Sequence, residues 1–234
     1  GSSSYIDTGG NLVNSLTSIT VSGWFYTNAN TNYSYGLQFG TDGNSGEALG
    51  IARWNNTASG GFDAYTLYVR DGAQSIDGNY VLNENTWYHI TVTWTGTTIK
   101  FYVNGSLVQT ATSSASLSIP ASGNSGYLGR YIVNQDFNWN GKIDQVRLFN
   151  KVLNADDIAT LYAETSSTAS NTNPFNEGAG VALYSLDYDA SEASGYYDGT
   201  SSNVTFGVGG NINFGARFNG TNSGVLIAAT ATTP

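Results

Sequence analysis

The sequence contains no cysteine and only one histidine, His89, among its 234 residues. Without cysteine, the chain cannot form disulfide bonds, thiolate zinc sites or cysteine nucleophiles. A single histidine leaves one candidate for a Ser-His-Asp triad and excludes a metal site built from several imidazoles. Much of ordinary enzyme chemistry is therefore excluded before any motif is considered.

Charged residues are also scarce, at 11 % of the chain, and the 17 acidic residues outnumber the 8 basic ones. The net charge of −9 argues against a nucleic-acid partner, because no basic stripe is present to neutralise phosphates. No apolar run approaches the length of a membrane span, so we expect no membrane insertion. The polar surface must come mostly from Asn, Ser, Thr and 29 glycines.

The dominant pattern is an alternation of apolar and polar residues, which is typical of β-strands. Residues 86–94 alternate throughout, so one face of this segment is apolar and the other carries Trp87, His89 and threonines. A second alternating run at 99–103 is followed by Asn104-Gly105, a dipeptide that favours a type I′ turn. These residues predict a β-hairpin.

The same alternation recurs along the rest of the chain. Further strands are expected at residues 19–26, 35–39, 49–54, 65–70, 126–130 and 142–149. One short helix is expected near 155–163, because Asn154 can cap its start and two aspartates follow in the first turn. The sequence therefore predicts an all-β fold, a two-sheet antiparallel β-sandwich or jelly roll with one short helix.

Three segments, in this order and spacing, resemble the laminin-G-like (concanavalin A-like) jelly-roll domains. Residues 19–26 resemble the family's early Thr-Val-Ser-x-Trp strand, residues 87–105 its central hairpin, and residues 141–150 with the following helix its closing strand and tail. The composition and an apparent internal repeat resemble, more particularly, the tandem laminin-G-like repeats of bacteriophage fibre or decoration proteins and of bacterial surface adhesins.

The order of the segments departs from the family pattern. The family normally begins with strands like 182–187, 215–220 and 5–7, in that order, but here the first two come last. We therefore predict a laminin-G-like jelly roll at 1–165 without its opening strands, a linker at 166–180, and opening strands at 181–234. These strands could belong to the next copy of an array, complete the same sandwich, or complete that of a neighbouring chain. An uncovered edge beside the closing strand would be a liability, so we expect it to be covered.

Catalysis is not expected. His89 is interpreted as a sheet-face residue bonded to neighbouring hydroxyls, because no nucleophile or acid is indicated beside it. Glucanases of the resembled superfamily carry Glu-x-Asp-x-x-Glu on one strand, and the scattered glutamates of this chain do not form that pattern.

A calcium site is one interpretation of the most acidic stretch, residues 187–198, because oxygen ligands at its first, third, fifth and twelfth places are typical of a calcium loop. Glu192 stands where a helix-loop-helix site needs glycine, but the resemblance implies a structural calcium in such an opening loop. A plain solvated turn is the alternative. The candidate ligands are Asp187, Asp189, Ser191 and Asp198, with Asp144 as a weaker addition.

Aromatic residues beside amides indicate possible sugar binding, since aromatic faces contact the apolar side of a pyranose while amides bond its hydroxyls. The candidates are Trp54 with Asn55, Tyr131 with Asn134, and Trp139. The alternative is that both tryptophans are anchors of the core.

The sequence and the resemblance together predict a non-catalytic recognition or structural module of an extracellular or virion-surface protein. Its expected partner is a glycan or cell-surface polysaccharide. A purely architectural repeat, joined to neighbouring copies by strand exchange, is the second hypothesis, and a glycan-active enzyme is the third.

Overall fold

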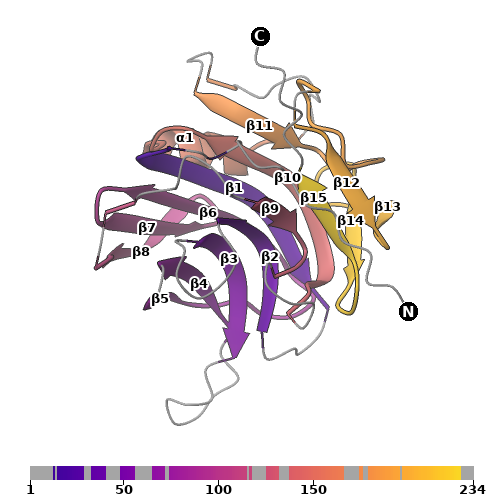
Figure 1. Ribbon diagram of the computed structural model, residues 1–234, viewed down its shortest axis with the longest axis horizontal. Coiled ribbons are helices and arrows are strands. Elements are labelled where there is room, and N and C mark those ends of the chain that lie inside the picture. Colours follow the sequence, from indigo (N-terminus) through magenta and orange to yellow (C-terminus); the bar gives the residue numbers. More distant parts are fainter. Residues whose placement is uncertain are drawn as a thin grey trace.

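In a computed structural model of the chain, the alternating segments form two antiparallel sheets packed face to face (Figure 1). The structure describes residues 13, 15–28, 33–40, 48–55, 65–71, 74–114, 116–117, 125–131, 137–165, 174–175, 179–195 and 197–227. The expected β-sandwich with one short helix is confirmed.

The first sheet has the strand order β13-β14-β10-β1-β6-β7-β8, with β11 also paired to β10. Its strands are β1 (Ser18–Thr27), β6 (Trp87–Thr95), β7 (Thr98–Val103), β8 (Ser106–Thr112), β10 (Asn140–Phe149), β11 (Gly180–Tyr184), β13 (Thr205–Gly209) and β14 (Phe214–Asn219). The second sheet has the order β12-β15-β9-β2-β3-β4-β5. Its strands are β2 (Tyr33–Gly40), β3 (Ala48–Asn55), β4 (Tyr65–Asp71), β5 (Gln74–Val81), β9 (Ser125–Leu128), β12 (Gly199–Ser202) and β15 (Gly224–Ile227).

The core lies between the two sheets and is built by apolar side chains of strands from both of them. β6 contributes Ile90, Val92 and Trp94, all fully buried, and the second sheet contributes Leu37 and Leu128. Burying each such side chain stabilises the fold by about 1.5–3 kcal/mol. The Asn104-Gly105 turn joins β7 to β8 with positive φ angles of 50° and 77°, as the type I′ prediction requires.

The helix α1 (Ala155–Tyr162) covers part of the outer face of the first sheet (Figure 1). Asn154 and Asp157 form a capping box at its start, in which each side chain accepts a hydrogen bond from the other residue's backbone N–H. Ile158 and Leu161 pack with Phe149 of β10 in a second, smaller apolar cluster. Among the described residues, no helix is long and apolar enough to cross a membrane.

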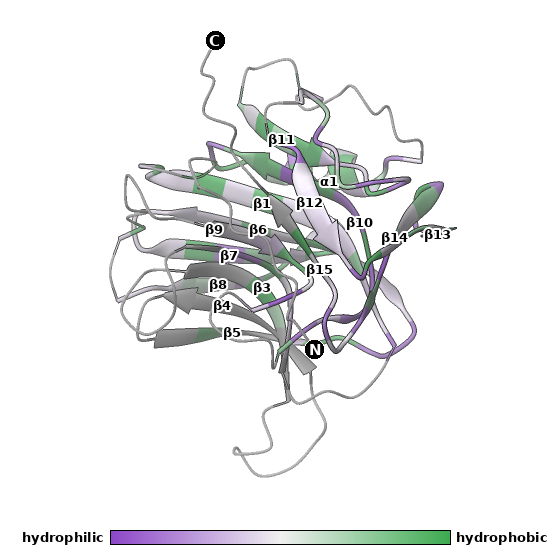
Figure 2. Cartoon of the chain, turned by 45° about the vertical axis from the view of Figure 1, so that its right-hand side comes forward, coloured by the Kyte–Doolittle hydropathy of each residue, from purple (hydrophilic) through white to green (hydrophobic). Residues whose placement is uncertain are grey.

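The strands after the helix complete both sheets within the same chain. β14 pairs with the first half of β10, from Asn140 to Ile143, and β11 pairs with the second half, from Val146 to Phe149. Gln145 separates the two halves with a φ of 50°, which bends β10 so that its edge meets two partners in turn. Figure 2 shows hydrophobic, green segments along β11, whereas β12, with sequence GTSS, is pale. Ala182, Leu183 and Tyr184 of β11 are buried, so the strand adds apolar side chains to the molecule's interior beside β10.

Candidate functional site

Two members of the expected calcium set, Asp144 and Asp187, hold the turn between β13 and β14. Asp144 Oδ2 accepts hydrogen bonds from the backbone N–H groups of Asn211 and Ile212, at 2.9 and 2.8 Å. Asp187 Oδ1 accepts one from the N–H of Phe214, at 3.2 Å. The two carboxylates therefore come from distant parts of the sequence and fix the same turn.

This turn also requires a glycine. A Cβ placed on Gly210 would lie 2.2 Å from the backbone oxygen of Phe214 and 2.6 Å from Asp144 Oδ2. Neither contact is possible without moving the turn, so the glycine permits the close approach between the Asp144 carboxylate and the backbone.

Asp144 is fully buried, and its second oxygen, Oδ1, has no hydrogen-bond partner among the described residues. Burial raises the pKa of Asp144 from 3.8 to about 7; the N–H donors of Ile212 and Asn211 and, more weakly, the adjacent Gln145 side chain oppose the rise, and the Asp187 carboxylate adds to it. Burial also raises the pKa of Asp187, against the hydrogen bond from Phe214. A buried acid with a second, half-buried acid near it favours either a bound proton or a bound cation.

The other expected calcium ligands do not join this pair. Asp189 Oδ1 accepts a hydrogen bond from the N–H of Ser191, at 2.8 Å, and both residues are exposed. Asp198 Oδ1 accepts one from the N–H of Glu192, at 2.9 Å, and Glu192 is itself buried as an acceptor for Leu183. These acids cap the backbone of their own loop.

Within the described ranges, no group of three or more His, Cys, Asp or Glu residues is placed to hold a metal ion. The single five-residue calcium site of the sequence interpretation is therefore not assembled, because the loop uses its carboxylates as turn caps. Of these five residues, Asp187 is close enough to Asp144 to raise its pKa, and the Asp144 oxygen Oδ1 has no hydrogen-bond partner among the described residues. Their carboxylate oxygens are the kind of ligand that a hard cation takes.

Trp139 is a core residue, so its assignment to ligand binding is wrong. Its side chain is 1 % exposed and packs edge to face on Phe25, with 5.8 Å between the ring centroids. Its indole Nε1–H donates to the backbone oxygen of Tyr26 at 3.0 Å. A buried indole with a satisfied donor cannot stack on a sugar.

Tyr131 is also unsuited to an open sugar platform, since it is 7 % exposed. It packs between Tyr35, at a centroid distance of 4.8 Å, and Phe137, at 5.5 Å. Trp54 and Asn55 end β3, opposite Tyr33 and Tyr65 of the neighbouring strands respectively, and their side chains lie outside the described part. Asn134 lies outside the described residues.

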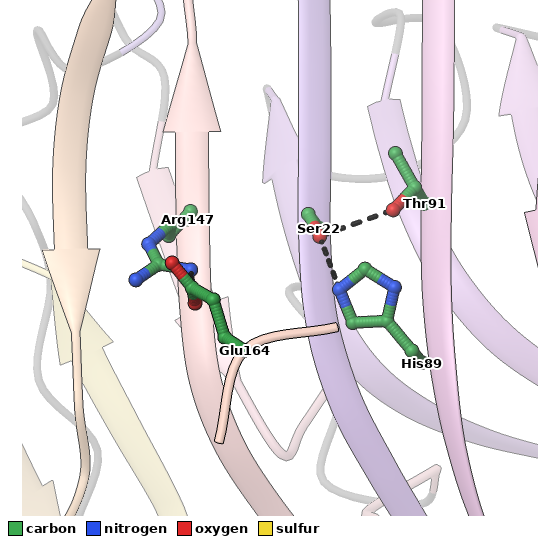
Figure 3. A network of polar contacts seen from close by, with 5 residues as sticks. All are labelled: Ser22, His89, Thr91, Arg147 and Glu164. Carbon is green, nitrogen blue, oxygen red and sulfur yellow. Dashed lines mark hydrogen bonds and ion pairs between the residues drawn. The ribbon is translucent and has the colours of Figure 1, made fainter. Parts of the chain in front are cut away.

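His89 has the structural role that the sequence favoured. It is buried, and its Nε2 shares a hydrogen bond of 2.9 Å with Ser22 Oγ, which also accepts from Thr91 Oγ1 at 3.0 Å (Figure 3). Burial, with a smaller contribution from the nearby charge of Arg147, lowers the pKa of His89 to about 3. The imidazole is therefore neutral at physiological pH, and it is closed off from solvent.

Beside this network, a buried ion pair joins the first sheet to the segment after the helix. Arg147 Nη1 of β10 lies 2.5 Å from Glu164 Oε2, and the two side chains are 3 % and 20 % exposed (Figure 3). Glu164 follows the C-terminus of α1, so the pair ties the helix to the sheet.

An open aromatic surface lies farther along the same outer face of the first sheet. Tyr26 of β1 and Trp87 of β6 are cross-strand partners, both partly exposed, with 5.5 Å between ring centroids. Lys142 Nζ of β10 lies 5.1 Å from the centroid of Tyr26 and 6.0 Å from that of Trp87. The phenol of Tyr26 donates to Asn85 Oδ1 at 3.4 Å.

Sequence reasoning missed this surface, although a signal was present. The alternation in 86–94 puts Trp87 on the polar side of its strand, and a large aromatic residue on a polar side is a candidate for recognition. Its neighbours could not be identified, because Tyr26 and Lys142 meet Trp87 only through strand register.

The family described as the concanavalin A-like lectin/glucanases superfamily, in its Laminin_G_3 form, matches residues 1–159 of the chain. The chain belongs to this family. No curated protein sequence matches this laminin-G-like chain.

Solved structures with the same fold share little sequence with this laminin-G-like chain. A putative carbohydrate-binding protein from Bacteroides ovatus is 16 % identical, with a TM-score of 0.59 over 93 % of this chain and 55 % of that one. Domain 4 of an extracellular arabinanase from Geobacillus stearothermophilus, in complex with arabinotriose, is 22 % identical, with a TM-score of 0.50 over 67 % and 69 %. A sialidase module from Ruminococcus gnavus, bound to α2,3-sialyllactose, is 16 % identical, with a TM-score of 0.50 over 64 % and 84 %. The chain thus spans about half of the B. ovatus protein.

Proposed function

We propose that this laminin-G-like chain is a non-catalytic carbohydrate-binding module of an extracellular or virion-surface protein, where it serves adhesion to a glycan. The observation that carries the proposal is the open pair of aromatic rings, Tyr26 and Trp87, on the outer face of the first sheet. The carbohydrate-binding protein and the two glycan-bound modules of the same fold support it.

Binding would be an equilibrium process on a preformed surface. The two partly exposed rings offer apolar surface to the C–H side of a pyranose. Asn85, which bonds Tyr26, and Lys142, whose Nζ lies over the rings, are polar partners for its hydroxyls. Because β1 and β6 pair along nearly their whole length, the backbone that carries the rings need not rearrange. A preorganised site loses little conformational entropy on binding.

Replacement of Trp87 by alanine tests the proposal. On a glycan array, the wild-type chain is expected to bind at least one glycan, and the W87A variant to bind it about tenfold or more weakly, because an aromatic platform is typically a hot spot. The matched control is Y188A, which removes an aromatic side chain that is 72 % exposed and contacts Phe214 rather than the Tyr26–Trp87 pair. Absence of wild-type binding to any glycan, or equal loss in both variants, would contradict the assignment of this surface.

A structural calcium ion is a further part of the proposal. Asp144 Oδ1 and Asp187 are the groups that would hold it, and the ion would supply positive charge to a buried acid, Asp144, and a half-buried one, Asp187. By neutralising that pair it would rigidify the turn between β13 and β14.

The alternative function, an architectural repeat of the kind found in tandem arrays, is favoured by one observation. The strands that cover β10 follow the helix in sequence, so β11 and β14 could pair in the same way with β10 of a neighbouring copy. Chain-like species that grow with concentration on a sizing column would support strand exchange, and a strict monomer would exclude it.

A further inference from the structure

A row of four side chains crosses the first sheet at the open aromatic surface. Trp87 of β6 is paired with Tyr26 of β1, Tyr26 with Lys142 of β10, and Lys142 with Arg217 of β14. Residues directly opposite each other in an antiparallel sheet project from the same face. The row therefore presents two aromatic rings and then two cations, over about 14 Å at the usual spacing of strands.

Lys142 and Arg217 are neighbours in the sheet although the chain is acidic and poor in basic residues. The chain has only 8 lysine and arginine residues against 17 acidic ones, yet Lys142 and Arg217 are directly opposite each other. Like charges in this position destabilise a sheet. Within the described part of the chain, neither forms an ion pair, whereas the buried Arg147 has Glu164.

The remaining contacts of these cations leave their charge uncompensated. Lys142 Nζ donates to the backbone oxygen of Gly209 at 2.9 Å and lies over the two rings, so its position is fixed. Arg217 is exposed. Lysine and arginine beside each other form a place for a carboxylate, which arginine can bind through two parallel hydrogen bonds.

We propose that this row binds an acidic saccharide, with the sugar ring on Tyr26 and Trp87 and the carboxylate on Lys142 and Arg217. The inference rests on the proposed glycan-binding function and names the class of its ligand. A neutral sugar would use the rings and the polar groups beside them, and would leave the two cations without a counter-ion.

The test uses an array in which uronate- and sialate-containing oligosaccharides are each printed beside their carboxyl-reduced forms. Wild-type protein is expected to bind acidic members more tightly than their reduced counterparts. K142Q and R217Q are each expected to weaken acidic binding about three- to tenfold, which is the range for a partly exposed charge-assisted contact. R217Q is expected to leave any binding to neutral members unchanged, because Arg217 lies beyond the two rings and their polar neighbours.

The matched control is K100Q, which removes a cation of β7 outside the row. R217Q also guards against misfolding: because Arg217 is exposed and lies opposite another cation, the melting temperature of this variant is expected to be no lower than that of wild type. Equal binding of acidic and reduced forms, or an unchanged R217Q, would overturn the inference and leave glycan binding intact. No binding to any oligosaccharide would overturn the proposed function and the inference together.

Discussion

In the presence of a chelator, the buried titratable groups of the wild-type chain are expected to change its free energy of unfolding little between pH 4 and 6.5. The reason is that the contributions of Asp144 and His89 change with pH in opposite directions. Asp144 has its pKa raised from 3.8 to about 7, so the native state holds a proton that the unfolded state releases. This contribution falls as the pH rises. His89 has its pKa lowered from 6.5 to about 3, so over this range the unfolded state binds a proton that the native state does not bind. The contribution of His89 to the free energy of unfolding therefore rises with pH.

Single variants are expected to reveal each contribution. D144N leaves His89 unopposed, so stability should rise by about 3 kcal/mol from pH 4 to 6.5, at about 1.4 kcal/mol per pH unit for one proton. H89Q leaves Asp144 unopposed, so stability should fall by about the same amount over that window. Denaturant unfolding at a series of pH values measures both, and the difference between variants removes the contribution of all other groups.

Calcium gives a second measurement on the same carboxylate. At pH 7.5 calcium is expected to raise the melting temperature of wild type, because a ligand that binds only the native state stabilises it. At a concentration one hundred times its dissociation constant, the ion would add about 2.7 kcal/mol to the free energy of unfolding. At pH 4.5 the proton on Asp144 should reduce the effect. D187N is the variant that should lose the response to calcium.

In the pH series, stability profiles of D144N and H89Q that run parallel to that of wild type would contradict the assignment of both shifted pKa values.

Removal of the Glu164 carboxylate is expected to lower the free energy of unfolding by about 3 kcal/mol, because E164Q leaves the charge of Arg147 buried without a counter-ion. The pair is short, at 2.5 Å, and the guanidinium side is 3 % exposed, so water cannot replace the lost partner. The lost ion pair should weaken the attachment of α1 to the sheet most, because Glu164 directly follows the C-cap of this helix.

A double variant separates the charge from the packing. R147M with E164Q removes both members of the pair and keeps an apolar stem at position 147, so most of the lost stability should return. Urea unfolding of the single and double variants measures this difference. A value for E164Q within 0.5 kcal/mol of wild type would show that the ion pair contributes nothing to the attachment of the helix.

The local parts of the fold could be predicted because their causes lie within a few residues. The Asn104-Gly105 turn, the Asn154 cap and the alternation in 86–94 each follow from neighbouring side chains. Trp139 could not be placed in this way: it lies in a polar stretch, and its burial depends on Phe25, more than one hundred positions earlier.

The candidate site was only partly predictable for the same reason. The sequence predicts Asp144 and Asp187 as acids of one calcium site, but their common role at the β13–β14 turn depends on how the C-terminal strands cover β10. The alternation assigned Trp87 to the polar face, yet only the position of α1 shows that this end of the face is open. Long-range register, rather than any local motif, places Lys142 and Arg217 side by side.

The most direct test of glycan binding at this surface is a nuclear magnetic resonance titration of the indole N–H signals. The chain has 5 tryptophans, so each signal can be assigned by substitution. On addition of a bound oligosaccharide, the indole signal of Trp87 is expected to shift most, while that of the buried Trp139 stays in place. A titration that moves another tryptophan and leaves Trp87 unchanged would contradict the account.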